Sequence, residues 1–210
     1  MTSNDINLRT FQNDDLLPIA SILVDAFDSK FSRLSTLNRE ELRDYIIDSS
    51  FIDIVEPNNI IIATIKNEVV GILSLKCNKI KILQNKKMLS FNELVKKYGL
   101  FNTVKLGLGT SLLKEEEKNN ACYIDFIAVK KEHRSKGIGK KLITNSCEIT
   151  FNRLNKQYLT LYVSSKNIRA IKLYKNLGFH VVKKTRSLLT YFTFKEIEWS
   201  YMILEKYNDK

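Results

Sequence analysis

The sequence contains few of the residues that build metal centres or covalent catalytic triads. It has two histidines, His133 and His180, which lie far apart in the chain. This argues against a structural zinc site and against a Ser/His triad. Its three cysteines, Cys77, Cys122 and Cys147, are an odd number without the spacing of a metal motif. Each falls within an apolar strand or helix pattern, so we expect buried, reduced thiols and no metal.

Long apolar runs are also missing. The longest are far too short to span a membrane. The first five residues, Met-Thr-Ser-Asn-Asp, have neither the positive charge nor the apolar stretch of a signal peptide. We therefore expect a cytoplasmic protein that has no membrane partner.

The chain does have enough apolar sequence for one domain, together with a surplus of positive charge. Its 210 residues, 44% of them hydrophobic, suit a single α/β domain over 1–210. The 34 Lys and Arg against 23 Asp and Glu give a net charge of +11, which raises nucleic acid as a partner. The lysines are spread along the chain and no nucleic-acid motif accompanies them, so we discount this partner.

The segment 122–142 predicts a buried strand, a basic turn and a helix start in direct succession. Tyr123 to Val129 is β-branched and aromatic, while Gly137 and Gly139 open the helix. A helix that begins on glycines leaves its first N–H groups open to a ligand, and its dipole adds positive charge there. Phosphate is the ligand that this arrangement favours. Basic side chains surround the turn, namely Lys130, Lys131, Arg134, Lys136, Lys140 and Lys141.

Two better-known phosphate loops do not fit this turn. A Walker loop needs a glycine in place of Arg134 and a Ser or Thr in place of Lys141. The dinucleotide fingerprint needs a third glycine where Leu142 stands, and the pair Gly107 and Gly109 lacks its third glycine too.

The pattern that fits is Arg134-x-x-Gly137-x-Gly139, and on it the chain closely resembles the GNAT superfamily of N-acetyltransferases. The resemblance implies acetyl-CoA as co-substrate, with its pyrophosphate held by successive backbone amides of the loop. It also assigns the preceding strand to the pantetheine and the acetyl carbonyl, where an N–H stabilises the developing oxyanion. The coenzyme-binding residues expected here are Ile127, Ala128, Val129, Arg134, Ser135, Lys136, Gly137, Ile138, Gly139 and Lys140.

A second segment, 167–179, resembles the other GNAT signature. Asn167 predicts the N-cap and Gly178 the end of a helix of about ten residues, on which Asn167, Ala170 and Tyr174 share one face. Asn167 and Tyr174 are about 10 Å apart along this helix, roughly the reach of a pantetheine arm. The other apolar residues of the segment are left to pack on the sheet, namely Ile168, Leu173, Leu177 and Phe179.

Tyr174 is the candidate general acid. The resemblance places Asn167 and Ala170 along the pantetheine and Tyr174 near the coenzyme sulfur. With a reference pKa of about 10, a tyrosine is protonated at pH 7 and can donate to a thiolate whose acid has a pKa of about 8.5. A half-buried aromatic residue on an amphipathic helix is the structural alternative.

The mechanism implied by the resemblance is direct attack of an amine on the thioester, with both substrates bound and no covalent enzyme intermediate. The attacking ammonium must first lose a proton, since reference pKa values are about 10.4 for a lysine-like amine and about 8 for an α-amine. Asp125 has the same strand parity as Ile127 and Val129 and is the candidate base. A carboxylate that only makes structural hydrogen bonds is an equal alternative.

The fold class implied is the mixed α/β GNAT fold, a mostly antiparallel central sheet with a parallel, splayed pair of fourth and fifth strands and helices on both faces. Expected helices begin at Asn13, Asn38, Gly137 and Asn167. The expected strands are 6–11, 60–66, 69–77, 123–129, 158–163, one after Phe179, and 199–204.

Residues 78–120 depart from a minimal GNAT domain, because about forty residues replace a tight connection between the third and fourth strands. Ser90-x-x-Glu93 predicts a capped helix, and a second helical pattern runs through Val104, Leu108 and Leu112 before a charged turn at 114–118. Three roles are open for this insertion beyond folding: lining the acceptor pocket, packing on the flank, or forming a homodimer contact.

Three function classes remain. The first is an N-acetyltransferase acting on a primary amine, the second a catalytically silent acyl-CoA-binding module, and the third a basic nucleic-acid or ribosome-associated protein. Tyr174 and the intact loop glycines favour the first, and a nucleic-acid binder should show strong salt dependence without coenzyme affinity. The acceptor stays open among a small amine, an antibiotic, a polyamine and a protein terminus.

Overall fold

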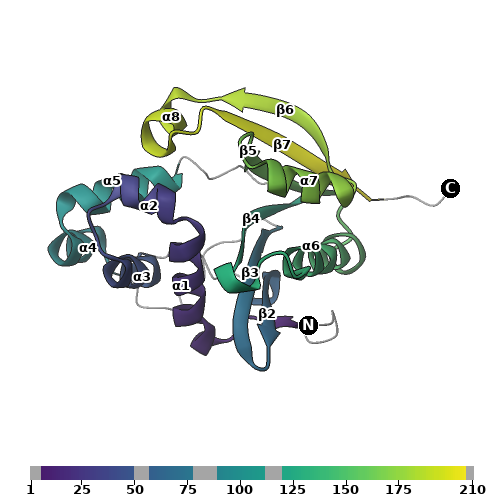
Figure 1. The fold of residues 1–210 in the computed structure, drawn as a ribbon, viewed down its shortest axis with the longest axis horizontal. Helices are drawn as coiled ribbons and strands as arrows, with labels where there is room; N and C mark the ends of the chain where they lie inside the picture. The colour runs from purple at the N-terminus through teal and green to yellow at the C-terminus, as the bar shows by residue number, and fades with distance from the viewer. Residues whose placement is uncertain (1–5, 50–56, 78–88, 112–119, 207–210) are drawn as a thin grey trace.

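The computed structural model describes residues 6–49, 57–77, 89–111 and 120–206, and within them the chain forms one seven-stranded sheet (Figure 1). The strand order is β1-β2-β3-β4-β5-β7-β6, and among the described pairs only β4 and β5 run parallel. This confirms the predicted mixed sheet. The strands are β1 (Asn7–Thr10), β2 (Ile60–Ile65), β3 (Glu68–Lys76), β4 (Ala121–Val129), β5 (Tyr158–Ser164), β6 (His180–Arg186) and β7 (Glu198–Glu205).

Helices cover both faces of the sheet, as predicted, with α1 to α5 on one side and α6 and α7 on the other (Figure 1). They are α1 (Leu16–Ala26), α2 (Asp28–Leu34), α3 (Arg39–Asp48), α4 (Phe91–Tyr98), α5 (Leu100–Ser111), α6 (Ile138–Glu148), α7 (Ile168–Asn176) and α8 (Leu188–Phe194). The sequence did not predict α2 and α8, which are only seven residues long. Within the described ranges, none of the helices is long and apolar enough to cross a membrane.

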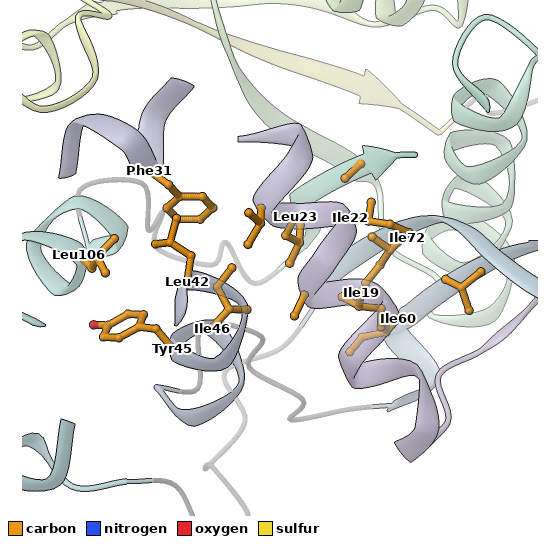
Figure 2. Packing of buried hydrophobic residues seen from close by; sticks show 14 of the residues in the cluster. Ile19, Ile22, Leu23, Phe31, Leu42, Tyr45, Ile46, Ile60, Ile72 and Leu106 are labelled. Carbon is orange, nitrogen blue, oxygen red and sulfur yellow. The ribbon is translucent and has the colours of Figure 1, made fainter. Parts of the chain in front are cut away.

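Alternation along the central strands divides the apolar residues between two cores. Ile60 and Ile62 of β2 pack with α1 in the first core, while Ile61 and Ala63 face α6 in the second. Figure 2 shows the first core, where Phe31 of α2 lies beside side chains of α1 and α3. Such alternation is what a sheet covered on both faces requires.

Gly71 of β3 allows α6 to approach the sheet closely. A Cβ atom at this position would lie 3.0 Å from Ile138 Cγ2 and 3.3 Å from Leu142 Cδ1. Both side chains are buried in the second core. The start of α6, and with it the basic loop that precedes the helix, is therefore set against the sheet by direct packing.

The predicted insertion docks on the helices of the N-terminal region. Ser90 and Glu93 form the expected capping box at the start of α4. The Tyr98 hydroxyl donates to Asp48 Oδ2 at 2.6 Å, and the backbone N–H of Thr36 donates to Asn102 Oδ1 at 3.0 Å. Segments 78–88 and 112–119, which include Leu112 and the charged turn, lie outside the described residues. The described part of the insertion, residues 89–111, thus contributes Leu94, Tyr98 and Leu106 to the first core.

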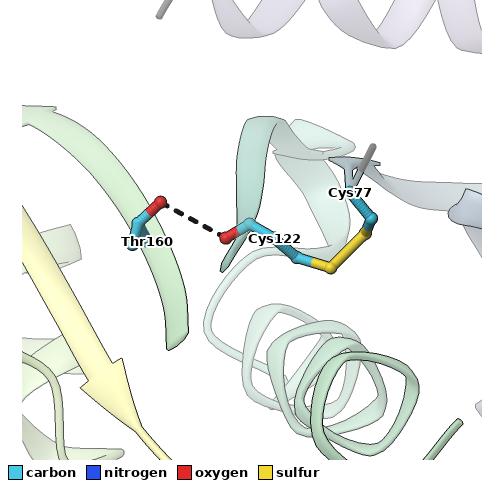
Figure 3. The surroundings of a disulfide bond; sticks show 3 residues. All are labelled: Cys77, Cys122 and Thr160. Atoms are coloured by element: carbon cyan, nitrogen blue, oxygen red, sulfur yellow. Dashed lines mark hydrogen bonds between the residues drawn. A yellow bond between two sulfur atoms is a disulfide. The ribbon is translucent and has the colours of Figure 1, made fainter. Parts of the chain in front are cut away.

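The prediction of reduced thiols is wrong for two of the three cysteines, because Cys77 and Cys122 form a disulfide (Figure 3). Lys76, the last residue of β3, pairs with Tyr123 in the antiparallel β3–β4 ladder. Cys77, which follows it, therefore meets Cys122, and the two Cα atoms are 4.1 Å apart. Cys147 stays a thiol, and burial raises its pKa to about 11. The sequence concealed the pairing because 45 residues separate the two cysteines.

Candidate functional site

Strands β4 and β5 separate part of the way along their length. They pair only from Ala121 to Ile124 of β4 with Tyr158 to Leu161 of β5, and the later residues of both strands border a cavity of about 1060 Å³. Side chains from both cores line this cavity, among them Phe126 from the first and Tyr174 from the second. The cavity therefore crosses the sheet at the splay, with side chains from both faces in its wall.

Asp125 lies at a bulge in β4 and faces this cavity. Ser74 pairs with Phe126 and Leu75 with Ile124, which leaves Asp125 without a partner in β3. The bulge interrupts the regular alternation on which the predicted parity of Asp125 with Ile127 and Val129 depends. The Lys76 Nζ lies 2.9 Å from Asp125 Oδ2, so the carboxylate is ion-paired at the cavity wall.

Tyr174 faces the same cavity from α7. It is 6% exposed and its ring centroid lies 5.7 Å from that of Phe179. Burial raises the pKa of Tyr174 to about 12, so the hydroxyl is protonated at neutral pH. The cavity thus contains both predicted catalytic side chains.

The rest of α7 matches its prediction except at one position. Asn167 lines the cavity, and its Oδ1 accepts from the backbone N–H of Ala170 at 3.2 Å, which makes it the expected N-cap. Gly178 has a φ of +94°, which completes the predicted end of the helix. Ile168, expected against the sheet, is instead 68% exposed because it lies in the first turn and points away from the second core.

The basic loop before α6 has the backbone of an anion site. Ser135 and Gly137 have φ angles of +66° and +83°, and Gly137 is the N-cap of α6 without any side-chain cap. Left-handed residues of this kind turn successive N–H groups toward one side. An added Cβ at Gly139 would meet only Leu173 Cδ2 at 3.5 Å, which is ordinary contact, so packing within the free protein does not require this glycine.

Several basic side chains around this loop are bonded to other groups of the protein. Lys141 Nζ donates to the Ile6 carbonyl at 2.6 Å, and Lys130 pairs with Glu68 and Glu132. Arg134 Nε donates back to the Val129 carbonyl at 3.0 Å.

Two of the predicted coenzyme-binding residues can contribute only backbone groups. Ile138 is buried in the second core and Ala128 in the first. Lys131, Ser135, Lys136 and Lys140 are exposed around the loop. The loop therefore offers an approaching anion backbone amides, with exposed cations beside them.

Arg169 is a residue of this site that the sequence did not reveal. It extends from the first turn of α7 and its Nη2 donates to Ser135 Oγ in the loop. The guanidinium adds a cation close to the exposed backbone N–H groups of the loop. Its position between Asn167 and Ala170 in the second motif was the available signal.

The far side of the cavity is lined by aromatic and charged residues that sequence reasoning also missed. Lys30 Nζ lies 5.2 Å from the Phe27 ring centroid and 5.0 Å from that of Trp199. Burial lowers the pKa of Lys30, and attraction to Glu196 partly offsets this effect. Glu196 in turn accepts from Ser164 Oγ at 2.6 Å and lies 3.9 Å from Lys166 Nζ.

Metal binding finds no support in the described part of the chain, where no group of three or more His, Cys, Asp or Glu side chains is placed to hold an ion. The arrangement combines a loop with exposed backbone N–H groups, which follows β4 in the chain, and a cavity whose wall includes a carboxylate and a protonated phenol. Such a pair can remove a proton from a nucleophile and stabilise a leaving group.

Comparison with known proteins agrees with this geometry. The family model described as "Acetyltransferase (GNAT) family" matches residues 19–179. No curated protein sequence matches the chain.

Solved structures with the same fold include an N-acetyltransferase from Staphylococcus aureus Mu50, with a TM-score of 0.64 and 21% identity over 94% of this chain and 100% of that one. A Salmonella typhimurium protein assigned as an acetyltransferase, solved with acetyl-CoA, has a TM-score of 0.59 and 16% identity over 96% and 94% of the chains. A variant of the spermidine N-acetyltransferase from Vibrio cholerae has a TM-score of 0.59 and 14% identity over 97% and 95%.

Proposed function

The chain belongs to the GNAT family of acetyltransferases, and from this premise we propose that it transfers the acetyl group of acetyl-CoA to a primary amine by direct attack within a ternary complex. The observation that carries the proposal is the cavity that crosses the sheet at the splay and contains both Asp125 and Tyr174. Two substrates entering from opposite faces would meet there without a covalent enzyme intermediate.

The coenzyme would bind at the α6 and α7 side of the splay. Backbone N–H groups of 135–139 would hold the pyrophosphate, with Arg134, Lys136, Lys140 and Arg169 supplying positive charge. The arm would then run past Asn167 and Ala170 into the gap between β4 and β5. There the edge of β4 at 127–129 lies next to the path of the thioester, which suits a backbone N–H in the role of oxyanion donor.

Asp125 would take a proton from the acceptor ammonium, directly or through water, so that the neutral amine can attack the acetyl carbon. The tetrahedral intermediate then breaks its C–S bond, and nitrogen loses its second proton. Lys76 holds Asp125 at the cavity wall in the absence of acceptor. The base role and the structural role thus fall on the same carboxylate.

Tyr174 would stabilise the departing thiolate. With a pKa raised to about 12, its hydroxyl is a weaker acid than a thiol of pKa about 8.5, so complete transfer to a free thiolate is unfavourable. A strong hydrogen bond to the developing thiolate avoids this cost. The proton released by nitrogen then completes the formation of free CoA thiol, and Tyr174 ends the cycle protonated.

The insertion would help to form the acceptor side. Phe91 and Leu94 of α4 and Val104 and Leu108 of α5 line the cavity. We therefore assign the insertion to the acceptor pocket, within one domain over 1–210, rather than to a homodimer contact.

A cytoplasmic location is also part of the proposal, and the Cys77–Cys122 disulfide is the observation that bears on it. Disulfides persist in oxidising compartments and are rare in a reducing cytosol. Alkylation and mass spectrometry of the protein taken directly from cells would count its free thiols. Three free thiols would support the cytoplasm, and a single one would place the protein in an oxidising compartment.

The experiment that tests the function has two parts. Acetyl-CoA at a hundred times its dissociation constant should raise the unfolding free energy by about 2.7 kcal/mol. Release of CoA thiol should follow when an amine acceptor is added. A protein that shows neither a thermal shift at millimolar acetyl-CoA nor thiol release with any amine would refute the proposal.

A further inference from the structure

The acceptor side of the cavity is built for an apolar group. Phe27 and Phe31 from the α1–α2 region, Phe126 from β4, Tyr162 from β5 and Trp199 from β7 all line it. Aromatic walls of this kind bind an apolar body through buried area and ring contacts. An acceptor that is polar along its whole length would leave this surface unused.

The charges in the cavity wall do not suit a polycation. The described lining residues include three lysines, Lys30, Lys76 and Lys166, against two carboxylates, Asp125 and Glu196. Each carboxylate already has a lysine within 4 Å, Asp125 through Lys76 at 2.9 Å and Glu196 through Lys166 at 3.9 Å. A polyamine would bring several positive charges into a wall that is already positive by one, and like charges in a desolvated site repel strongly.

Resting on the proposed acetyl transfer, we propose that the acceptor is a free amino acid or a close analogue, with an apolar side chain, an α-amine and an anionic group that Lys30 recognises. Lys30 Nζ lies over the Phe27 and Trp199 rings at the cavity wall, where an anion can approach it. Because burial lowers the pKa of Lys30, its charged form gains from an anionic ligand. The apolar side chain would then lie on the aromatic wall.

An α-amine also fits the catalytic groups. The reference pKa of about 8 is that of a peptide α-amine, and the neighbouring carboxylate of a free amino acid raises the pKa of its amine to about 9. Roughly one such amine in a hundred is then neutral at pH 7, compared with about one in a few thousand for a lysine-like amine of pKa about 10.4. Asp125 is ion-paired with Lys76, and an α-amine needs less help from such a base because a larger fraction of it is already neutral.

The test compares three acceptors that share a phenyl ring and an amine but carry a carboxylate, an amide or neither beside the amine, together with one polyamine. L-Phenylalanine, L-phenylalaninamide, 2-phenylethylamine and spermidine are each supplied with saturating acetyl-CoA, and kcat/KM is measured at several pH values to correct for amine ionisation. The same set is repeated with leucine and its amide. We expect the amino acid to exceed its amide by about tenfold to a hundredfold, the usual effect of a buried hydrogen-bonded charge. Equal efficiency with the amide, or spermidine as the best acceptor, would overturn the inference.

Two lysine variants locate the effect. Lys30→Met removes the charge and keeps the stem, so KM for the amino acid should rise and the preference over the amide should disappear. Lys30→Arg should restore part of it. Lys105→Met is the matched control, because Lys105 also lies over an aromatic ring, 4.1 Å from the Phe101 centroid, but does not line the cavity. A preference unchanged in Lys30→Met would refute the role of Lys30.

Failure here is distinct from failure of the acetyl transfer itself. The acetyl-CoA thermal shift is measured in every variant and should stay at the wild-type value. If the acetyl-CoA thermal shift is retained and the enzyme prefers amides or polyamines, only the proposed acceptor class is overturned. Loss of the shift and of all turnover in the wild type overturns both proposals, and a shift without turnover on any amino acid also overturns this one.

Discussion

We assign the coenzyme to one end of the site and the acceptor to the other, and these two ends are built from different kinds of sequence information. The loop at 130–140 is one continuous segment whose backbone conformation, at Ser135 and Gly137, makes the proposed anion site. The acceptor end takes side chains from α2, β4, β5 and β7, which meet only after folding. Recognition by backbone leaves a local motif in the sequence. Recognition by side chains from distant elements leaves none, and it can change without disturbing the loop.

The sharpest way to break the coenzyme end alone is Gly139→Leu. The free protein has room for a Cβ here, 3.5 Å from Leu173 Cδ2, so stability without ligand should change little. The larger side chain should block approach to the bare backbone and reduce acetyl transfer to background. The expected gain of about 2.7 kcal/mol in unfolding free energy on addition of acetyl-CoA, seen as a thermal shift, should vanish. Gly139→Ala is the control, since one methyl group should weaken binding without abolishing it.

Equal acetyl-CoA shifts in wild type and Gly139→Leu would show that the loop backbone does not hold the coenzyme. The coenzyme end would then not be distinguished from the acceptor end by recognition through the backbone.

Breaking the disulfide should affect the fold at the root of the insertion. A cross-link that spans 45 residues stabilises by about 2 to 4 kcal/mol in the chain-entropy account. Urea unfolding with and without reductant should show this loss in wild type and in Cys147→Ala, the matched control. The double variant Cys77→Ala/Cys122→Ala should be indifferent to reductant. A wild type whose midpoint does not move on reduction would mean that the cross-link contributes nothing to stability.

Local patterns predicted most of the fold, because capping and alternation act over a few residues. The capping boxes at Asn38 and Ser90 stand at the starts of α3 and α4, and Asn167 caps α7. The bulge at Asp125 escaped, since a single inserted residue cannot be seen in an alternating pattern. The two disulfide cysteines escaped because strand register across an insertion is a tertiary property.

In the candidate site too, the residues that belong to local motifs could be predicted and those brought together by folding could not. Tyr174 and the loop glycines belong to short motifs, and the structure brings Tyr174 and Asp125 to one cavity. Lys30 carried no signal that separates it from the other 33 Lys and Arg of the chain. It becomes notable only when α2 packs and sets it over Trp199 of β7.

Tyr174→Phe tests the point where the two ends meet. The ring and its packing on Phe179 remain, while the hydrogen bond to the thiolate is lost. Turnover should fall by about 10², near the lower end for acid catalysis because a thiolate leaves tolerably well without help. Coenzyme binding should be unchanged. Tyr201→Phe, another buried tyrosine but outside the cavity, is the control and should keep near-normal turnover.

Tyr174→Phe should also change how the stability of the protein depends on pH. The pKa of Tyr174 is about 12 in the folded protein against about 10 unfolded, so its neutral form favours folding below pH 10 and this contribution is lost as pH rises toward 12. Tyr174→Phe should therefore lose less stability than wild type between pH 10 and 12. Identical alkaline unfolding curves would show that Tyr174 titrates normally in the folded protein.

Asp125→Asn gives the smallest expected effect, and its size distinguishes the acceptor classes. Asp125 can speed the reaction by no more than the ratio of protonated to neutral amine. For a free amino acid, whose carboxylate raises the pKa of the amine to about 9, the loss at pH 8 should be about tenfold and should disappear near pH 10. A lysine-like acceptor of pKa about 10.4 would allow a loss of about 10² to 10³ at pH 8, and part of this loss would persist at pH 10. The kcat/KM of wild type and variant is measured from pH 6 to 10 with the best amino acid, while the acetyl-CoA shift serves as control. A pH-independent loss would instead indicate that the neutral amide of the variant no longer holds Lys76, because removal of the 2.9 Å ion pair alters the cavity wall at every pH.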